Sequence, residues 1–334
     1  MKSFLFAVNA VMPIILMVCV GYVLKRIGLC SLDFAKKANK LVFRVFLPAM
    51  LFLNVYKIES LSGFDLTYVG YVLGFQFIAF LVMIPVVRKL TPDSGKRGVL
   101  LQASFRSNYA LVGIPLATSL FGDAGAAVAT LLSVALIPMI NMLAVVSLTI
   151  FRDGDDGIKP SVISLVKRII LGIVKNPLII SIAAGCVVLV VRAIFVKLGI
   201  EFRLTDIKPV YSVLTSLSSV ATPIALIVLG AQFEFSVITD MRREIISGIL
   251  VKGIINPLVA LAIAAVFFRN VFGGAHFASF VAAFATPVAV STVPMAQEMN
   301  GDVTLAGQLV VWSTVLSGFV IFFASLVLKS IGIF

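Results

Sequence analysis

The sequence predicts an all-α polytopic membrane protein whose ten transmembrane helices form two inverted repeats of five helices each. Composition is the first observation: 60% of the 334 residues are hydrophobic and only 13% are charged, whereas a soluble domain carries about a quarter charged residues. Mean hydropathy is +1.14. The second observation is a pair of similar, interrupted hydrophobic segments, one in each half of the chain. Together these features indicate a membrane transporter.

Ten apolar runs are long enough to cross a hydrocarbon core, which requires about 20 residues per helix. The runs that contain the interruptions are expected to be broken helices. In order, the expected spans are 4–24, 35–56, 66–88, 98–121 (broken), 124–150, 177–199, 207–232, 243–268, 274–298 (broken) and 303–328.

A polar linker at 152–175 divides the chain into a first repeat, 1–151, and a second repeat, 176–334. Its second part, SLVKRIILGIVK, is expected to form an amphipathic helix on the membrane surface. Sixteen lysines and arginines fall on the linker's side of the membrane and eight on the other. The side richer in basic residues is cytoplasmic, so both termini are expected outside, in a cell (inner) membrane. Because each repeat holds an odd number of helices, the two repeats point in opposite directions.

Two segments break the helical pattern at corresponding places, Phe105–Gly125 and Phe284–Thr304. Proline removes a backbone donor and clashes with the preceding turn, so a helix kinks or breaks there. A break at membrane depth is tolerated where it lines a cavity or is packed in protein. Paired interruptions of this kind indicate the binding site of a secondary transporter. The positions that match at a spacing of 179 are Phe105/Phe284, Ala110/Ala289, Pro115/Pro294, Ala117/Ala296, Gly122/Gly301 and Asp123/Asp302.

The two breaks supply most of the candidate substrate-binding residues. Proline suits the first turn of a helix, so Pro115 and Pro294 are expected to restart half-helices whose free amides and positive dipole ends attract anions. Small polar side chains beside the breaks can bind substrate or simply cap the broken ends. The full set of candidates is Arg106, Ser107, Asn108, Tyr109, Gly113, Pro115, Lys252, Pro287, Ser291, Thr292 and Pro294.

Basic residues within the spans indicate the sign of the substrate. Arg106 lies about ten residues, or roughly 15 Å, from the cytoplasmic end of its helix and so near the midplane. Lys252 is similarly deep, whereas Arg44, four residues beyond Lys40, can snorkel to the interface. A charge at such depth normally faces a cavity or a partner, and no acidic residue is expected beside it, so the cavity should favour anions. For Lys252 two structural alternatives stay open: it offsets carbonyl ends of the broken helices, or it pairs with Glu234.

Other functional classes fit less well. The sequence has no HExxH, nucleophile elbow or intramembrane carboxylate pair for an enzyme or antiporter, and no repeated filter for a channel. Three cysteines without paired spacing and one histidine argue against a disulfide framework or a metal site, and no cofactor is expected. The net charge of +12 resides in short loops, as membrane topology requires, which argues against nucleic acid as a partner. The expected partners are a small organic anion and the lipid bilayer, with a homodimer as an open alternative.

Several motifs, taken in their order and spacing, resemble the auxin efflux carrier family of membrane transporters over essentially the whole chain. They are ANKLVFRVFLPAMLF at 38–52, the pair Asn176–Pro177, PIALIVLG at 223–230 and the two broken segments. The resemblance implies a fold similar to sodium–proton antiporters and bile-acid symporters, with a scaffold domain and a transport domain whose fourth and ninth helices cross as unwound segments. By the same resemblance the residues at the crossover are Asn108, Pro115, Pro287 and Pro294.

The resemblance also implies a function. Bacterial members carry small carboxylates such as malate or malonate, and plant members carry auxin. We therefore expect a secondary transporter of small organic anions, similar to malate or malonate permeases, that works by alternating access at the crossover of helices 4 and 9. The alternative is a sodium- or proton-coupled symporter of bile-acid-like or other amphipathic anions.

Overall fold

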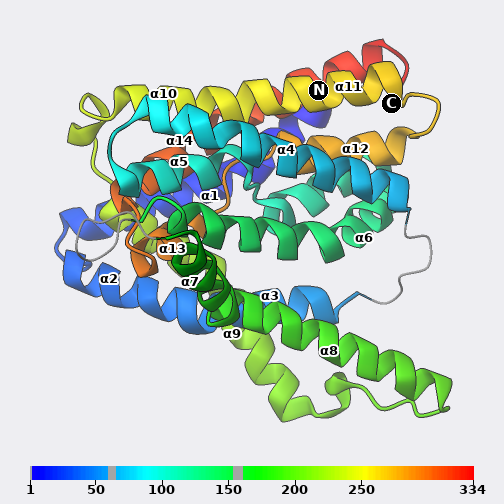
Figure 1. Cartoon of the computed structure of the whole chain (residues 1–334). Helices are drawn as coiled ribbons and strands as arrows, with labels where there is room; N and C mark the ends of the chain where they lie inside the picture. Colours follow the sequence, from blue (N-terminus) through cyan, green and yellow to red (C-terminus); the bar gives the residue numbers. More distant parts are fainter. Residues whose placement is uncertain (1, 59–64, 153–160) are drawn as a thin grey trace.

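A computed structural model describes residues 2–58, 65–152 and 161–334 of the chain. In these ranges the regular structure is helical, and the single β contact is an isolated bridge between Ser107 and Val288. The long helices lie side by side in one bundle, from which α8 (Pro177–Lys197) projects at the lower right of Figure 1. The protein is thus an all-helical, polytopic membrane protein.

The described residues of the first half of the chain form six α-helices, several of them joined end to end. Asp65 and Asp93 cap the N-termini of α4 and α5, since their carboxylates accept hydrogen bonds from backbone amides in the first turn. The helices are α1 (Lys2–Arg26), α2 (Leu32–Leu41), α3 (Leu47–Tyr56), α4 (Leu66–Leu90), α5 (Ser94–Phe105) and α6 (Ile114–Thr149), with π-helical turns at Val42–Phe46 and Tyr109–Gly113.

The second half begins with α7 (Val162–Val174) on the linker, followed by α8. A π-helical turn at Val251–Ile255 joins α10 to α11 in the same way as the turn before α3. Short 3-10 turns lie at Leu204–Asp206 and Ser236–Ile238. The remaining helices are α9 (Lys208–Gln232), α10 (Arg242–Leu250), α11 (Asn256–Phe267), α12 (Gly274–Phe284), α13 (Thr292–Glu298) and α14 (Val303–Ser330).

Seven helical stretches in the described ranges are long and apolar enough to cross a membrane. They are Leu32–Tyr56, Leu66–Leu90, Tyr109–Thr149, Pro177–Lys197, Lys208–Gln232, Arg242–Phe267 and Val303–Ser330. One of them, Tyr109–Thr149, joins the end of the expected span 98–121 to the next span, 124–150, through a kink. The kink lies at Phe121 and Gly122, where Gly122 adopts φ 60°, a value that glycine adopts without steric cost. The arrangement as ten helices in an inverted repeat stays a prediction.

The expected linker is described only in part. Its residues 153–160, including Lys159, lie outside the described residues. The expected amphipathic helix corresponds to α7, which begins at Val162, capped by the Ser161 hydroxyl. This helix packs against α6 and keeps Val162 and Ile163 exposed. An exposed apolar face on a helix with three nearby basic residues is typical of a helix at a membrane surface.

Two groups of helices meet around the centre of the protein. In one group α3, α8 and α9 pack together, with α1 crossing α9. At that crossing a Cβ on Gly21 would lie 1.9 Å from the Ile227 carbonyl oxygen, and one on Gly230 would lie 2.0 Å from that of Val18. In the other group α5, α6 and α12 pack together, surrounded by α4, α11 and α14. The candidate functional site lies where the two groups face each other.

Candidate functional site

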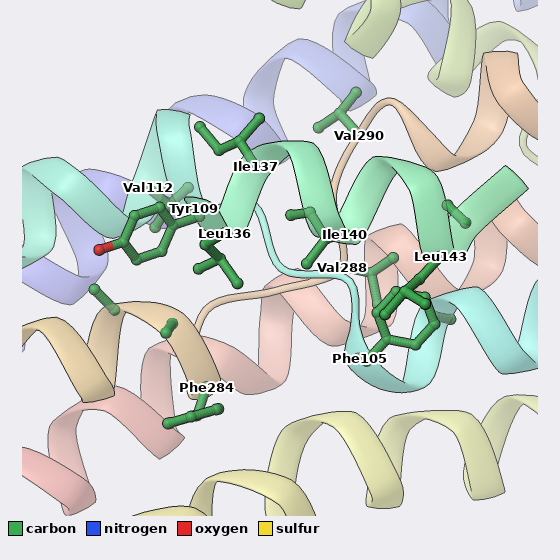
Figure 2. Packing of buried hydrophobic residues seen from close by; sticks show 14 of the residues in the cluster. Phe105, Tyr109, Val112, Leu136, Ile137, Ile140, Leu143, Phe284, Val288 and Val290 are labelled. Atoms are coloured by element: carbon green, nitrogen blue, oxygen red, sulfur yellow. The ribbon is translucent and has the colours of Figure 1, made fainter. Parts of the chain in front are cut away.

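The site is built on two interruptions that lie side by side. Helix α5 ends at Phe105 and α12 ends at Phe284, and the backbone after each of them is not helical until the next helix starts. Figure 2 shows the two unwound traces crossing beside α6, near Ile140 and Val288. The crossing contains the antiparallel bridge between Ser107 and Val288. Buried apolar side chains of both halves surround it, so the unwound backbone is packed in protein, as a membrane interior requires.

One backbone hydrogen bond ties the two breaks together. The amide of Asn108 donates to the carbonyl of Pro287 over 2.8 Å. The reciprocal bond cannot form, since proline has no backbone N–H. The Asn108 carbonyl instead accepts from the amides of Val112 at 3.0 Å and Gly113 at 3.3 Å, which starts the π-helical turn. Because Pro287 has no amide to donate, the strand-like pairing ends at Asn108, and the segment after Asn108 continues as a helical turn.

Pro115 and Pro294 lie in the first turns of α6 and α13, as expected, but the amides around them are not free as expected. A π-helical turn from Tyr109 precedes α6, so the amides of Val112 and Gly113 before Pro115 are already bonded. Helix α13 has only seven residues, and its early amides, those of Thr292 and Val293, bond to the carbonyls of Ala289 and Val290. In the described first break, the amides of Tyr109, Ala110 and Leu111, at the start of the π-helical turn, have no backbone acceptor.

Arg106 occupies the centre of the site and is 1% exposed. Its Nη2 donates to Asn141 Oδ1 at 2.8 Å and to Ser291 Oγ at 2.9 Å. Its Nη1 donates to Gln102 Oε1 at 3.1 Å and contacts the Met295 sulfur at 3.1 Å. All four partners are neutral, and none of the ion pairs between described residues includes Arg106. The site thus holds a buried positive charge that the described protein groups do not neutralise.

Two further polar groups beside Arg106 have unused hydrogen-bonding capacity. Ser107 Oγ and Asn108 Nδ2 are buried and have no hydrogen-bond partner among the described residues. A buried donor without an acceptor costs about 1–3 kcal/mol, and such groups in a protein normally have a partner. An acceptor-rich anion that reached Arg106 would also give these two donors an acceptor.

A small cavity connects these groups. About 50 Å³ of its space is open to the centre of a water molecule. Its polar wall carries Arg106, Asn108 and Ser291, and its opposite wall is formed by α3 and α9. The lining residues are Leu47, Met50, Leu51, Arg106, Ser107, Asn108, Tyr109, Ala110, Leu111, Ile137, Ile140, Asn141, Thr222, Ala225, Ala289, Val290 and Ser291. The cavity therefore lies between the two groups of helices and reaches both breaks.

Comparison with known proteins agrees with a membrane protein. A model of the membrane transport protein family matches residues 6–324. An uncharacterized transporter from Methanothermobacter thermautotrophicus is 26% identical over 333 residues, which cover 94% of this chain and 96% of the relative. The chain belongs to the membrane transport protein family. It is therefore a transporter rather than an enzyme, and the expected resemblance to the auxin efflux carriers is confirmed at the level of the family.

The transporter's cavity brings together five of the eleven candidate residues: Arg106, Ser107, Asn108, Tyr109 and Ser291. Tyr109 contributes its ring, because its hydroxyl donates to the carbonyl of Ala129 and bonds to Ser279, both at 2.9 Å. In Figure 2 this hydroxyl points away from Val290 on the cavity wall.

The other six candidates shape the breaks or lie elsewhere, and none of them lines the cavity. Position 113 requires glycine for steric reasons, because a Cβ there would lie 2.9 Å from the Tyr109 ring. Pro287 accepts the bond that joins the breaks, and Pro115 lies in the first turn of α6. Thr292 and Pro294 lie within α13, where Thr292 Oγ1 is buried without a hydrogen-bond partner among the described residues.

Lys252 is not brought to the cavity. Its Nζ donates to the carbonyl of Phe284, the last residue of α12, over 3.3 Å. A cation suits the negative end of a helix dipole, so the geometry agrees with the alternative in which Lys252 offsets a broken helix end. The other alternative is wrong, because Glu234 pairs with Lys25 at 3.6 Å.

Several cavity residues were missed by sequence analysis. Asn141 is the most important, since it accepts a hydrogen bond from Arg106. A buried asparagine in the middle of an apolar run, three residues after Pro138, was a signal that could have identified it. Met50 and Thr222 lie side by side on the wall opposite Arg106, with Thr222 Oγ1 3.8 Å from the Met50 sulfur. Both neighbour the prolines of the LPAM and TPIA segments, which sequence analysis used only as evidence of resemblance.

A polar cluster fastens the end of α13 to the opposite group of helices. Arg44 donates from Nε and Nη2 to one carboxylate oxygen of Glu298, both at 3.0 Å. Asn39 Nδ2 donates to the side-chain oxygens of Gln232 at 2.9 Å and Gln297 at 3.0 Å. We name these five residues the α13 anchor. Because α13 carries part of the second break, the anchor links one wall of the site to the other.

Proposed function

We propose that this transporter is a secondary carrier of small organic anions, such as carboxylates, and that the cavity at the crossing breaks is its substrate site. The observation that carries the proposal is Arg106, a buried guanidinium whose described partners are all neutral. An unpaired buried charge is costly, and a carboxylate satisfies it through charge-assisted, bidentate hydrogen bonds. The unused donors of Ser107 and Asn108 and the amides of Ala110 and Leu111 favour the same sign of ligand.

The carrier is built, in this proposal, from two inverted repeats, 1–151 and 176–334, joined by the linker 152–175. The bridge supports this division. Asn108 and Pro287 face each other in the antiparallel pairing, and they are also equivalent positions at the sequence spacing of 179. Two copies of a segment related by a two-fold axis meet at equivalent residues, and this pair would lie on that axis.

Alternating access would come from movement of the two groups of helices against each other. The cavity lies between α3 and α9 on one side and the breaks with α6 on the other. Small cavities at the interface of rigid groups can open to either side when one group shifts. The α13 anchor would hold the cytoplasmic end closed in this conformation.

The orientation places both termini outside and the linker in the cytoplasm of a cell (inner) membrane, as the distribution of basic residues favours. Single cysteines at Lys2 and at Lys167 test it in intact cells, after the three native cysteines are replaced. An impermeant maleimide should label the first variant and spare the second. Labelling of the variant with a cysteine at position 167 would show that the linker faces outward and would contradict the proposed orientation.

Uptake into proteoliposomes tests the function itself. The purified transporter should take up a labelled carboxylate with saturable kinetics and should ignore the corresponding neutral amide. Imposed pH and sodium gradients would separate carriage of the anion alone from the second candidate, a proton- or sodium-coupled symporter of amphipathic anions. Uptake that is equal for acid and amide, or absent for every carboxylate tried, would overturn the proposal.

A further inference from the structure

We infer that the substrate site accepts one carboxylate on a short aliphatic body, so that the preferred substrates are small monocarboxylates rather than dicarboxylates. This inference rests on the proposed function, since it assumes that the cavity at the breaks is the substrate site. It adds the number of charges, the length and the polarity of the substrate.

The number of charges follows from the residues that line the cavity. Among the lining residues that the structure describes, Arg106 is the single charged side chain. The other deep cation, Lys252, is turned to the carbonyl of Phe284 and is absent from the lining. A second carboxylate of a bound ligand would therefore lose its hydration without gaining a countercharge, which is strongly unfavourable.

The donors at the polar wall suffice for one carboxylate. Arg106 can present two N–H groups to a carboxylate in place of a weak partner such as the Met295 sulfur. Ser107 Oγ and Asn108 Nδ2 add two donors that have no described partner. A carboxylate has two oxygens with about four acceptor positions, and these groups can occupy them.

The opposite wall favours an aliphatic body. It consists of Leu47, Met50, Leu51 and Ala225, with Ile140 beside them, and its one polar side chain is Thr222. The Thr222 hydroxyl already contacts the Met50 sulfur. A hydroxyl or carboxylate on the far end of the substrate would meet these apolar groups, whereas a methyl or ethyl group would bury apolar surface against them.

The length follows from the volume. The cavity is small, about 50 Å³, which leaves room for a few water molecules. Propionate and butyrate are of this size. An aromatic acid such as phenylacetate is bulkier, so it is expected to bind this conformation less tightly than a short aliphatic acid.

Binding to the purified full-length transporter tests the inference with matched ligands. Radiolabelled propionate is displaced, at neutral pH, by butyrate, malonate, monomethyl malonate, phenylacetate and propionamide. Monomethyl malonate is the decisive control, because it keeps the malonate skeleton and carries one charge. We expect butyrate and monomethyl malonate to compete, and malonate to bind at least about tenfold more weakly than monomethyl malonate.

The outcomes separate this inference from the proposed function. Malonate that binds as tightly as monomethyl malonate, or phenylacetate that binds more tightly than butyrate, would overturn the inference and leave the anion site intact. If the protein binds neither propionate nor any competitor measured by direct thermal stabilisation, the proposed function fails with it. Competition by propionamide equal to that of butyrate would also overturn both, because an uncharged ligand would then suffice.

A gain-of-function variant adds a second, independent test. Thr222→Lys places a cation on the wall opposite Arg106, and Thr222→Met is its uncharged control of similar length. The lysine variant should narrow the difference between malonate and monomethyl malonate by at least about tenfold, whereas the methionine variant should keep the wild-type preference. If the lysine variant folds, as judged by its size-exclusion profile, and still excludes malonate, the inference that the site accepts one carboxylate for lack of a second cation is contradicted. If the variant does not fold, the ligand panel measured on the wild-type protein decides.

Discussion

Replacement of Arg106 should separate the charge of the guanidinium from its geometry. Arg106→Lys keeps a positive charge but replaces the planar fork by one nitrogen with three donors. Arg106→Gln removes the charge while keeping a polar side chain that can still bond to Asn141. The two variants therefore test whether the site needs a cation, a bidentate donor or both.

The magnitudes follow from the contacts of Arg106. Its two terminal nitrogens each have two acceptors, at 2.8 to 3.1 Å, so the guanidinium is held in one orientation. A hydrogen bond to a charged group contributes about 1.5–3 kcal/mol. The lysine variant loses one such bond to the substrate carboxylate and should bind about 10- to 150-fold more weakly. The glutamine variant loses the charge as well and should bind more than about 100-fold more weakly.

Stability should change in a different direction from binding. An unpaired buried charge destabilises the empty protein, so Arg106→Gln should keep or raise the melting temperature without substrate while binding is lost. The assay is scintillation-proximity binding of the tightest carboxylate, with thermal unfolding measured on the same preparation. Arg26→Lys serves as the matched control, since Arg26 is exposed and bonds to Tyr22 on its own helix. Wild-type affinity in the glutamine variant would refute the role of Arg106 as the anion-binding cation.

Two further predictions concern the packing that holds this conformation. Glu298→Gln removes the charge that Arg44 contacts in the α13 anchor. A partly exposed ion pair contributes about 0.2–1 kcal/mol, so in this variant a cysteine introduced at Ala225 should react with a thiol reagent up to about fivefold faster. An unchanged reaction rate would show that the ion pair does not restrain opening of the cavity. Gly230→Leu should lower the melting temperature or prevent folding, because even a Cβ at this position would lie 2.0 Å from the Val18 carbonyl oxygen. The control Gly74→Leu should be tolerated, because a Cβ at Gly74 has nothing within 4 Å. Equal stability of the two variants would contradict the close packing of α1 on α9.

Much of the fold follows from local pattern. The expected spans 66–88 and 303–328 correspond to α4 and α14 within two residues at each end, because apolar length and charged ends determine where a helix can cross a bilayer. The two interruptions were also predictable, since proline and glycine in an apolar run are unusual enough to be informative.

The details of the breaks were less predictable. The sequence predicts that a helix restarts at Pro115, but a π-helical turn from Tyr109 precedes this helix. The reason is a contact from the other half of the chain. Pro287 offers a carbonyl and no amide, so the Asn108 carbonyl turns back to the amides of its own chain. No pattern around residue 108 contains that information.

By itself the sequence determined the class of protein and the positions of several apolar helices, and it predicted that Arg106 lies deep, because these depend on composition and on the order of residues along one helix. Only the tertiary structure decided which deep residues share a cavity. Arg106 meets Asn141 and Ser291 there, whereas Lys252, equally buried, is directed to a helix end. Such placement depends on how helices distant in sequence pack and cross, and therefore on the direction in which each side chain leaves its helix. That direction is settled by packing rather than by local periodicity.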